Sequence, residues 1–109
     1  MDGLIVQNGT GYISSGISIT GGSIDSGGYA KSNGLTSVNV RFTANATSAT
    51  ISGFPKPAVS ANFVAVYVIR MDNNTVPNAF AWLSSAGVIS LQGLVSSGSY
   101  AISAVYAHA

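Results

Sequence analysis

One short segment carries most of the side chains that could recognise a ligand. It covers sixteen residues, and seven of them supply two aromatic rings, one guanidinium, one carboxylate and three amides. Protein sites for sugars pair an aromatic ring, which packs on the apolar C–H face of the sugar, with planar groups that hydrogen-bond the hydroxyls. The segment is therefore a candidate saccharide site. Its members are Tyr67, Arg70, Asp72, Asn73, Asn74, Asn78 and Trp82. The binding residues that we predict are Trp82, Arg70, Asp72, Asn73 and Tyr67.

A structural interpretation of the same residues stands beside the functional one. Trp82 and Tyr67 would then fill a core, Arg70 would end a strand in solvent, and Asp72 and Asn73 would form a turn. The two interpretations differ most at Trp82, because truncating a core tryptophan costs about 3–5 kcal/mol. If Trp82 binds sugar instead, its replacement by alanine removes binding and leaves the fold intact.

Groups for catalysis are scarce. The one histidine, His108, lies close to the C-terminal end, where chains fray, so a Ser-His-Asp arrangement is not expected. The three carboxylates are scattered and cysteine is absent, so we predict no metal site. Gly9-Thr10-Gly11 lacks the third glycine and the following helix of a dinucleotide loop. The sequence thus predicts a protein that is not an enzyme and uses no cofactor.

Charge is also scarce. Charged residues make up 6% of the chain, against roughly 25% in an ordinary soluble domain. Instead, 17 Ser, 7 Thr and 8 Asn supply uncharged hydroxyls and amides. The four cations are scattered, so nucleic acid is not an expected partner. No apolar run approaches the ~20 residues of a membrane helix, so no membrane insertion is expected.

Apolar residues recur at every second position along most of the chain, which predicts β-strands. In residues 36–43, for example, Val38, Val40 and Phe42 face one way, while Asn39 and Arg41 face the other. We predict about eight or nine strands at spacings of roughly 8 to 12 residues, which is typical of a sandwich or barrel. The fold class expected is a single all-β domain over residues 1–109, a compact antiparallel β-sandwich or barrel. The other predicted strands cover residues 4–7, 17–24 with a break at Gly21 and Gly22, 50–54, 63–69, 80–83, 88–91 and 100–106.

Two segments depart from this alternation. Ser26–Gly34 is rich in glycine and serine, which predicts a surface loop. Phe63–Ile69 is apolar on both faces, so the strand must be covered on both sides. A neighbouring subunit would supply the second cover. Together with the shortage of charge, this predicts a homotrimer. We expect Val66→Asp to dissociate it.

Several segments resemble the ends of phage tail-fibre and baseplate proteins, and the similarity extends over most of residues 12–106. They are Gly16-Ile17-Ser18-Ile19-Thr20-Gly21, Gly53-Phe54-Pro55-Lys56-Pro57, Ala86-Gly87-Val88-Ile89-Ser90-Leu91, Gly98-Ser99-Tyr100-Ala101-Ile102-Ser103 and Val105-Tyr106. The chain most resembles the head domains of receptor-binding proteins from siphophages of Gram-positive bacteria. The resemblance implies a trimeric β-sandwich or barrel head that binds host cell-wall saccharide, often in a cleft between protomers. Such heads use a Trp with His, Asp and Arg neighbours, and Trp82, Asp72 and Arg70 match three of these.

The leading hypothesis is thus a phage receptor-binding head that attaches to host saccharide without catalysis. It would reside in the virion, at the tail tip or baseplate, with other tail or baseplate proteins as partners. One alternative is a structural trimerisation or decoration module of a virion. Another is a monomeric carbohydrate-binding module. Solution mass separates the last from the other two, and glycan binding separates the first two.

Overall fold

Eight antiparallel strands build the part of the fold that the structure describes. The computed structural model describes residues 12–58, 63–72 and 78–109, and no helix occurs in these ranges. They accordingly hold no helix long and apolar enough to cross a membrane. The prediction of an all-β antiparallel sandwich or barrel is confirmed. In chain order the strands are β1 (Ser18–Thr20), β2 (Gly22–Ser32), β3 (Leu35–Ala44), β4 (Ser48–Ser52), β5 (Phe63–Arg70), β6 (Phe80–Ser84), β7 (Ile89–Gln92) and β8 (Ser99–Ala107).

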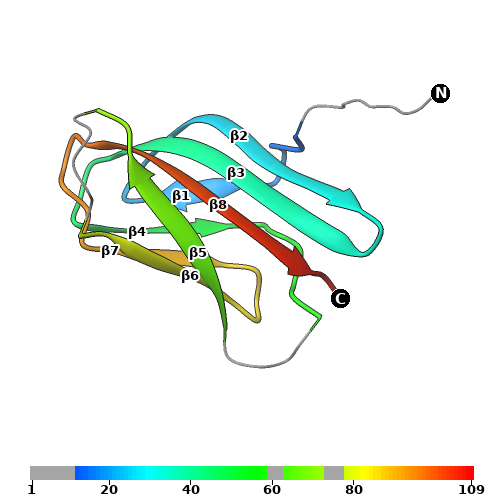
Figure 1. The fold of residues 1–109 in the computed structure, drawn as a ribbon. Coiled ribbons are helices and arrows are strands. Elements are labelled where there is room, and N and C mark those ends of the chain that lie inside the picture. The colour runs from blue at the N-terminus through cyan, green and yellow to red at the C-terminus, as the bar shows by residue number, and fades with distance from the viewer. Residues whose placement is uncertain (1–11, 59–62, 73–77) are drawn as a thin grey trace.

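One continuous sheet, in the order β1-β4-β7-β6-β5-β8-β3-β2, folds over into two layers (Figure 1). β5 belongs to both layers, because Phe63–Val66 pair with β6 whereas Tyr67–Arg70 pair with β8. β1 and β2 are the two edge strands of this sheet, and they are consecutive in the chain. Gly21, where φ is +96°, forms the corner that joins them. A Cβ on Gly21 would collide with the carbonyl oxygen of Ser48, so the corner requires glycine. The sheet thereby curls into a nearly closed barrel.

Alternate residues of each strand fill the space between the layers. On β3, Val38, Val40 and Phe42 are 0%, 1% and 0% exposed, as their alternation predicts. The Phe42 ring stacks on the buried Tyr100 ring at a centroid distance of 5.6 Å. Burying one such side chain contributes about 1.5–3 kcal/mol. The other strands contribute Ala49, Ile51, Val66, Ala81, Leu83, Ile89, Leu91, Ile102 and Tyr106 to this core.

The prediction of a surface loop at Ser26–Gly34 is wrong. Most of this segment belongs to β2, which pairs with β3 as far as Ser32 opposite Leu35. The turn is confined to Asn33 and Gly34, both at positive φ. A ladder uses backbone groups only, so glycine and serine can occupy a strand that lacks an apolar alternation. The strand predicted at residues 4–7 lies outside the described residues.

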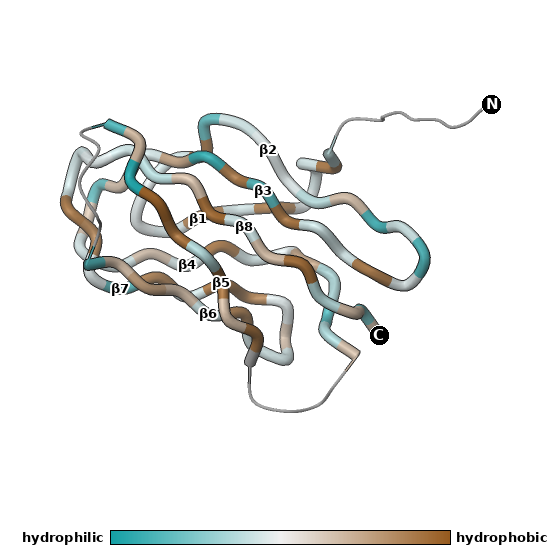
Figure 2. Tube along the Cα trace, viewed as in Figure 1, coloured by the Kyte–Doolittle hydropathy of each residue, from teal (hydrophilic) through white to brown (hydrophobic). Residues whose placement is uncertain are grey.

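β5 is apolar on both faces, as predicted, but the described residues cover only one of them. Val66 faces the core and is 7% exposed, whereas Tyr67 and Ile69 face outward and are 68% and 37% exposed. Figure 2 shows that hydrophobic residues run along most of β5. The expectation that Val66→Asp dissociates an oligomer is therefore corrected, because Val66 is a core residue of its own subunit.

Val66→Asp is expected to unfold the domain. An unpaired carboxylate in the core costs several kcal/mol, which is a large part of the roughly 5–15 kcal/mol that stabilises a domain. The matched control is Ala65→Asp, because Ala65 is the adjacent residue on the exposed face. Circular dichroism melting compares the two variants. Equal melting temperatures would contradict the inward orientation of Val66.

Candidate functional site

The pleat of β5 separates residues that the sequence places together. Tyr67 and Arg70 are three positions apart on one strand, so their side chains lie on opposite faces. Trp82 on β6 lies opposite Ala65 and so shares the outer face with Tyr67. Asn73, like Asn74, lies outside the described residues. The structure thus brings Tyr67 and Trp82 to one surface and directs Arg70 away from it.

Arg70 and Asp72 bind each other at one end of the barrel. The Nε of Arg70 donates to Asp72 Oδ1 at 2.7 Å, and its Nη2 donates to Oδ2 at 3.4 Å. The guanidinium carbon lies 5.9 Å from the ring centroid of Tyr100, a core residue. The hydrogen bond lowers the pKa of Asp72 and raises the pKa of Arg70. This pair therefore closes the end of the core, which for Arg70 differs from the structural interpretation of a strand end in solvent.

Phe80 and Trp82 form a stacked aromatic pair on the outer face of β6. Their ring centroids are 5.8 Å apart and their planes meet at 21°. Phe80 is 57% exposed, and Trp82 is half-buried. Beside the rings, Ala65 and Ala81 complete the lining of an open hollow of about 480 Å³. The small alanines leave the aromatic surface accessible. We call Phe80 and Trp82 the aromatic platform.

Uncharged polar side chains continue the platform across the sheet. Trp82 lies opposite Ser90, and Phe80 lies opposite Gln92. Residues paired in this way share a face, so the hydroxyl and the carboxamide lie beside the rings. At the far edge, the hydroxyls of Ser18 and Ser52 are 3.0 Å apart. The same outer face includes, from β4 and β1, Ser48, Thr50, Ser52, Thr20 and Ser18.

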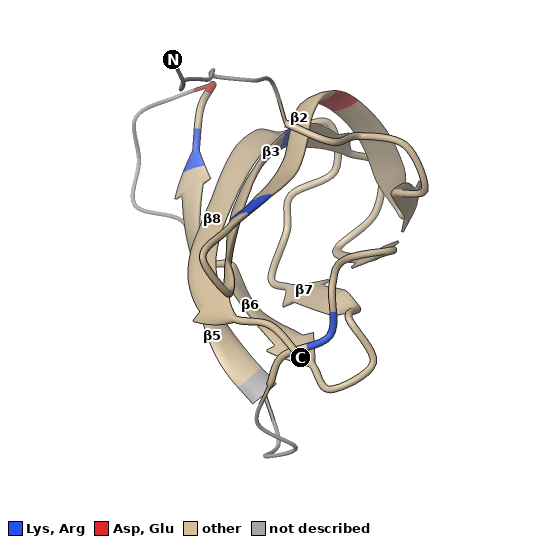
Figure 3. Cartoon of the chain, turned by 90° about the vertical axis from the view of Figure 1, so that its right-hand side faces the viewer, with Lys and Arg blue, Asp and Glu red and all other residues tan. Residues whose placement is uncertain are grey.

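No charged residue of the described ranges lies on β1, β4, β6 or β7. The charged residues of these ranges lie on the other strands and in the loops (Figure 3). A ligand on the platform would therefore be held by stacking and by neutral hydrogen bonds. The charged residues of the described ranges are Asp25, Lys31, Arg41, Lys56, Arg70 and Asp72.

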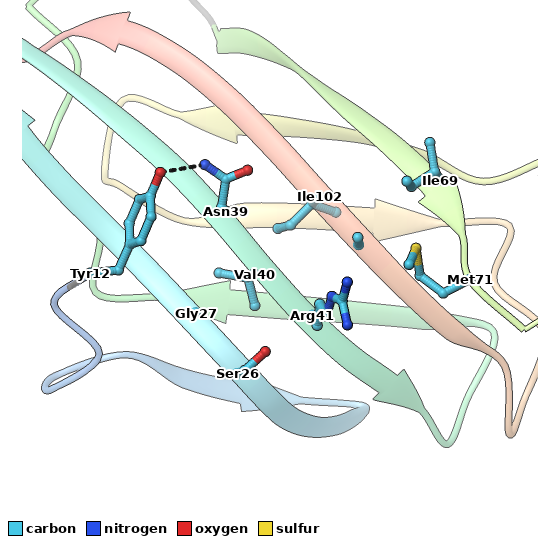
Figure 4. A pocket seen from close by; sticks show the side chains of 10 residues that line it. Tyr12, Ser26, Gly27, Asn39, Val40, Arg41, Ile69, Met71 and Ile102 are labelled. Atoms are coloured by element: carbon cyan, nitrogen blue, oxygen red, sulfur yellow. Dashed lines mark hydrogen bonds between the residues drawn. The ribbon is translucent and has the colours of Figure 1, made fainter. Parts of the chain in front are cut away.

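A second hollow, on the outer face of the other layer, was missed by the sequence reasoning. Its volume is about 320 Å³, and Figure 4 shows Tyr12, Asn39, Arg41 and Ile69 among the residues that line it. The alternation of β3 correctly turns Asn39 and Arg41 outward. Nothing in the sequence pattern indicates that residue 12 and β5 flank them, since these segments meet only through the sheet order.

His108 is held in place by the fold. Its Nδ1 lies 2.8 Å from the Oγ1 of Thr36, which is fully buried. Its backbone N–H also donates to the carbonyl of Gly34. The expectation that the chain frays at His108 is therefore wrong, because these two hydrogen bonds hold the residue against β3 and the β2–β3 turn. Within the described ranges, no three His, Cys, Asp or Glu side chains gather to hold a metal ion.

No family model, curated protein or solved structure matches the chain.

The hydrogen bond between Arg70 and Asp72 leads to a prediction about the acid titration of Asp72. Arg70→Gln is expected to raise the pKa of Asp72 toward the ordinary value of about 3.9, because the guanidinium hydrogen bond is the main cause of the lowered pKa. A lowered folded pKa stabilises the fold above the unfolded value, and this contribution is lost as pH falls through the folded value. Carboxyl ¹³C NMR titration measures the shift. An Asp72 pKa that is unchanged in the variant would contradict the assignment, and Lys56→Gln serves as the control.

Proposed function

We propose that this domain is a non-catalytic adhesin that binds a neutral saccharide on the outer face of β6 and β7. The observation that carries the proposal is the exposed platform of Phe80 and Trp82 beside the uncharged side chains of Ser90 and Gln92. Aromatic rings pack on the C–H face of a sugar ring. The carboxamide of Gln92 both donates and accepts hydrogen bonds, as sugar hydroxyls do. The absence of charge on β1, β4, β6 and β7 suits a neutral ligand.

The extent of the surface favours an oligosaccharide. The uncharged face crosses four strands, from β6 through β7 and β4 to β1. Three spacings of about 4.8 Å make a width of about 14 Å, which is more than one sugar ring covers. One end of this face is aromatic, and the rest offers hydroxyls. A chain of sugars would stack at β6 and hydrogen-bond along β7 and β4.

Only part of the predicted site enters this proposal. Trp82 belongs to the platform. Tyr67 follows on the same face, one step past the last β5–β6 pair, Val66 with Ala81, and it would flank a ligand. Arg70 and Asp72 are left out, because their side chains bind each other on the other side of β5. Asn73 is left out as well, because it lies outside the described residues.

Self-association is the second part of the proposal. Tyr67 on β5 and Val105 on the neighbouring strand β8 are 68% and 65% exposed. Apolar side chains so exposed, on a chain that is 6% charged, favour burial against another copy. The homotrimer is the stoichiometry implied by the resemblance to phage receptor-binding heads. It would put the platform beside a subunit boundary. A place at the phage tail tip or baseplate, among other tail proteins, belongs to the same proposal.

Trp82→Ala is expected to weaken saccharide binding at least tenfold and to change the melting temperature by only a few degrees. Its side chain lies on the outer face, so the variant loses the stacking surface and leaves the core filled. Leu83→Ala is the matched control for stability, because Leu83 is 0% exposed. Such a core truncation costs about 2–5 kcal/mol and lowers melting by roughly ten degrees or more.

The binding measurement starts with an array of cell-wall polysaccharides from Gram-positive bacteria, followed by calorimetry on the best ligand. Leu35→Ala is the control for binding, because Leu35 is also exposed but lies at the hairpin end of β3. Binding that is equal in the wild type and Trp82→Ala would overturn the platform as the site. A trimer that binds no glycan would support the structural module instead.

The mass in solution tests self-association. Light scattering is expected to give about three times the chain mass of 11.0 kDa. The double variant Tyr67→Asp with Val105→Asp is expected to give the single-chain mass, because two carboxylates would have to be buried at the contact. Leu35→Asp is the control and should leave the mass unchanged. A wild-type species of single-chain mass at micromolar concentration would refute the trimer.

A further inference from the structure

The outer face of the second layer carries a trough that runs along β8. In the strand pairing, Arg41 lies opposite Ala101, and Ala101 lies opposite Ile69. One row across β3, β8 and β5 thus has a small side chain between two large ones. The next row repeats this arrangement, with Asn39, Ser103 and Tyr67 in the same order. Because adjacent strands are about 4.8 Å apart, the walls stand about 10 Å apart.

The two walls of the trough differ in chemistry. On the β5 side, Ile69 and Met71 are 37% and 41% exposed and present an apolar wall. On the β3 side, Asn39 and Arg41 present an amide and a guanidinium, and Figure 4 shows them across β8 from Ile69 and Met71. Ala101 lies between these walls and lines the same hollow. A ligand in the trough would meet polar donors on one edge and hydrocarbon on the other.

Glycines in β2 bring a tyrosine to the rim of the trough. A Cβ on Gly28 would collide with the carbonyl oxygen of Ile13, so only glycine allows residue 13 to cross there. Ile13 and Tyr29 exchange two backbone hydrogen bonds of 2.7 and 3.0 Å, which anchor the crossing. Next to it, the hydroxyl of Tyr12 accepts a hydrogen bond from Asn39 Nδ2 at 2.7 Å. The rim is therefore held by contacts from three segments.

Arg41 is the cation of this trough. Among the described residues it forms no ion pair, since Arg70–Asp72 is the pair found there. The two carboxylates that border the adjoining hollow are both engaged. Asp25 accepts a hydrogen bond from Thr43 Oγ1 at 2.8 Å, and Asp72 is held by Arg70. The guanidinium fork of Arg41 is thus available for a planar anion.

We propose that this trough is a second ligand site, which binds a carboxylate-bearing sugar of the uronic acid class through Arg41. The guanidinium pairs bidentately with the carboxylate. The C–H face of the sugar ring packs on Ile69 and Met71, and Asn39 hydrogen-bonds a ring hydroxyl. A monoanion fits better than a dianionic phosphate, because one cation faces it while Asp25 and Asp72 stand nearby. The proposed contacts of this site, Arg41, Asn39, Ile69 and Met71, do not belong to the platform of Phe80 and Trp82, so the site does not rest on the proposed function.

Titration with glucuronate, followed by ¹H–¹⁵N NMR, tests the site. We expect shifts at the amides of Ala101 and Ser103, and binding of glucose at least tenfold weaker, since glucose lacks the carboxylate. Arg41→Gln is expected to weaken glucuronate binding at least tenfold, whereas Lys31→Gln, an exposed cation on β2, leaves it unchanged. Ala101→Leu is expected to block binding by filling the trough while Arg41 stays in place. The NMR spectrum of each variant reports whether it is folded.

Several results would overturn the second site. They are no shift with millimolar glucuronate, equal binding of glucose and glucuronate, equal loss in Lys31→Gln and Arg41→Gln, or tighter binding of glucose 6-phosphate than of glucuronate. Trp82→Ala separates this proposal from the proposed function. If that variant loses glucuronate binding and Arg41→Gln keeps it, the acidic sugar binds on the platform and the trough site fails. If Trp82→Ala loses only the neutral polysaccharide, both sites stand.

Discussion

The change of partner along β5 is the constraint on which the architecture depends. Its first half hydrogen-bonds to β6, and its second half, from Tyr67, hydrogen-bonds to β8. One strand thereby joins the two layers, and the corner at Gly21 joins their other edges. The two layers diverge from β5, and the inner face of this strand fills the space between them. That face carries Val64, Val66 and Val68, which all pack on the core. The curl of the sheet then leaves few unpaired strand edges.

The same strand determines what the two outer surfaces can do. Side chains alternate along β5, so the valines on its inner face place Tyr67 and Ile69 on its outer face. Tyr67 extends the aromatic platform on β6, whereas Ile69 forms the apolar wall of the trough over β8. The two candidate sites are therefore neighbours across β5, although one lacks charge and the other centres on Arg41. Substitutions on the outer face of β5 would affect both surfaces, and substitutions on β6 or β3 would affect only one.

Neutral hydrogen bonds join segments of this domain that lie far apart in the sequence. The hydroxyl of Tyr106 donates to the carbonyl of Pro55 at 2.6 Å, and burial raises the pKa of this tyrosine to about 12. The hydroxyl therefore remains a donor at any physiological pH. Thr36 and His108 make a similar bond between β3 and the end of the chain. These contacts tie the segments around the core without placing charge in it.

Period-two alternation in the sequence was enough to identify the all-β class, most strand positions and the inward residues of β3, because burial of every second side chain is a local property of a strand. It failed at β2, where Gly27 and Ser26 pair through their backbone without any apolar pattern. Nearness in the sequence also led us to group Trp82 with Arg70 in one site. The two side chains lie on opposite faces of the sheet, and nearness in the sequence does not indicate which face a side chain takes. Only the tertiary structure brought Tyr12, Arg41 and Ile69 around one trough. The physical reason is that the sheet order is set by packing between residues far apart in the chain, and no local pattern records it.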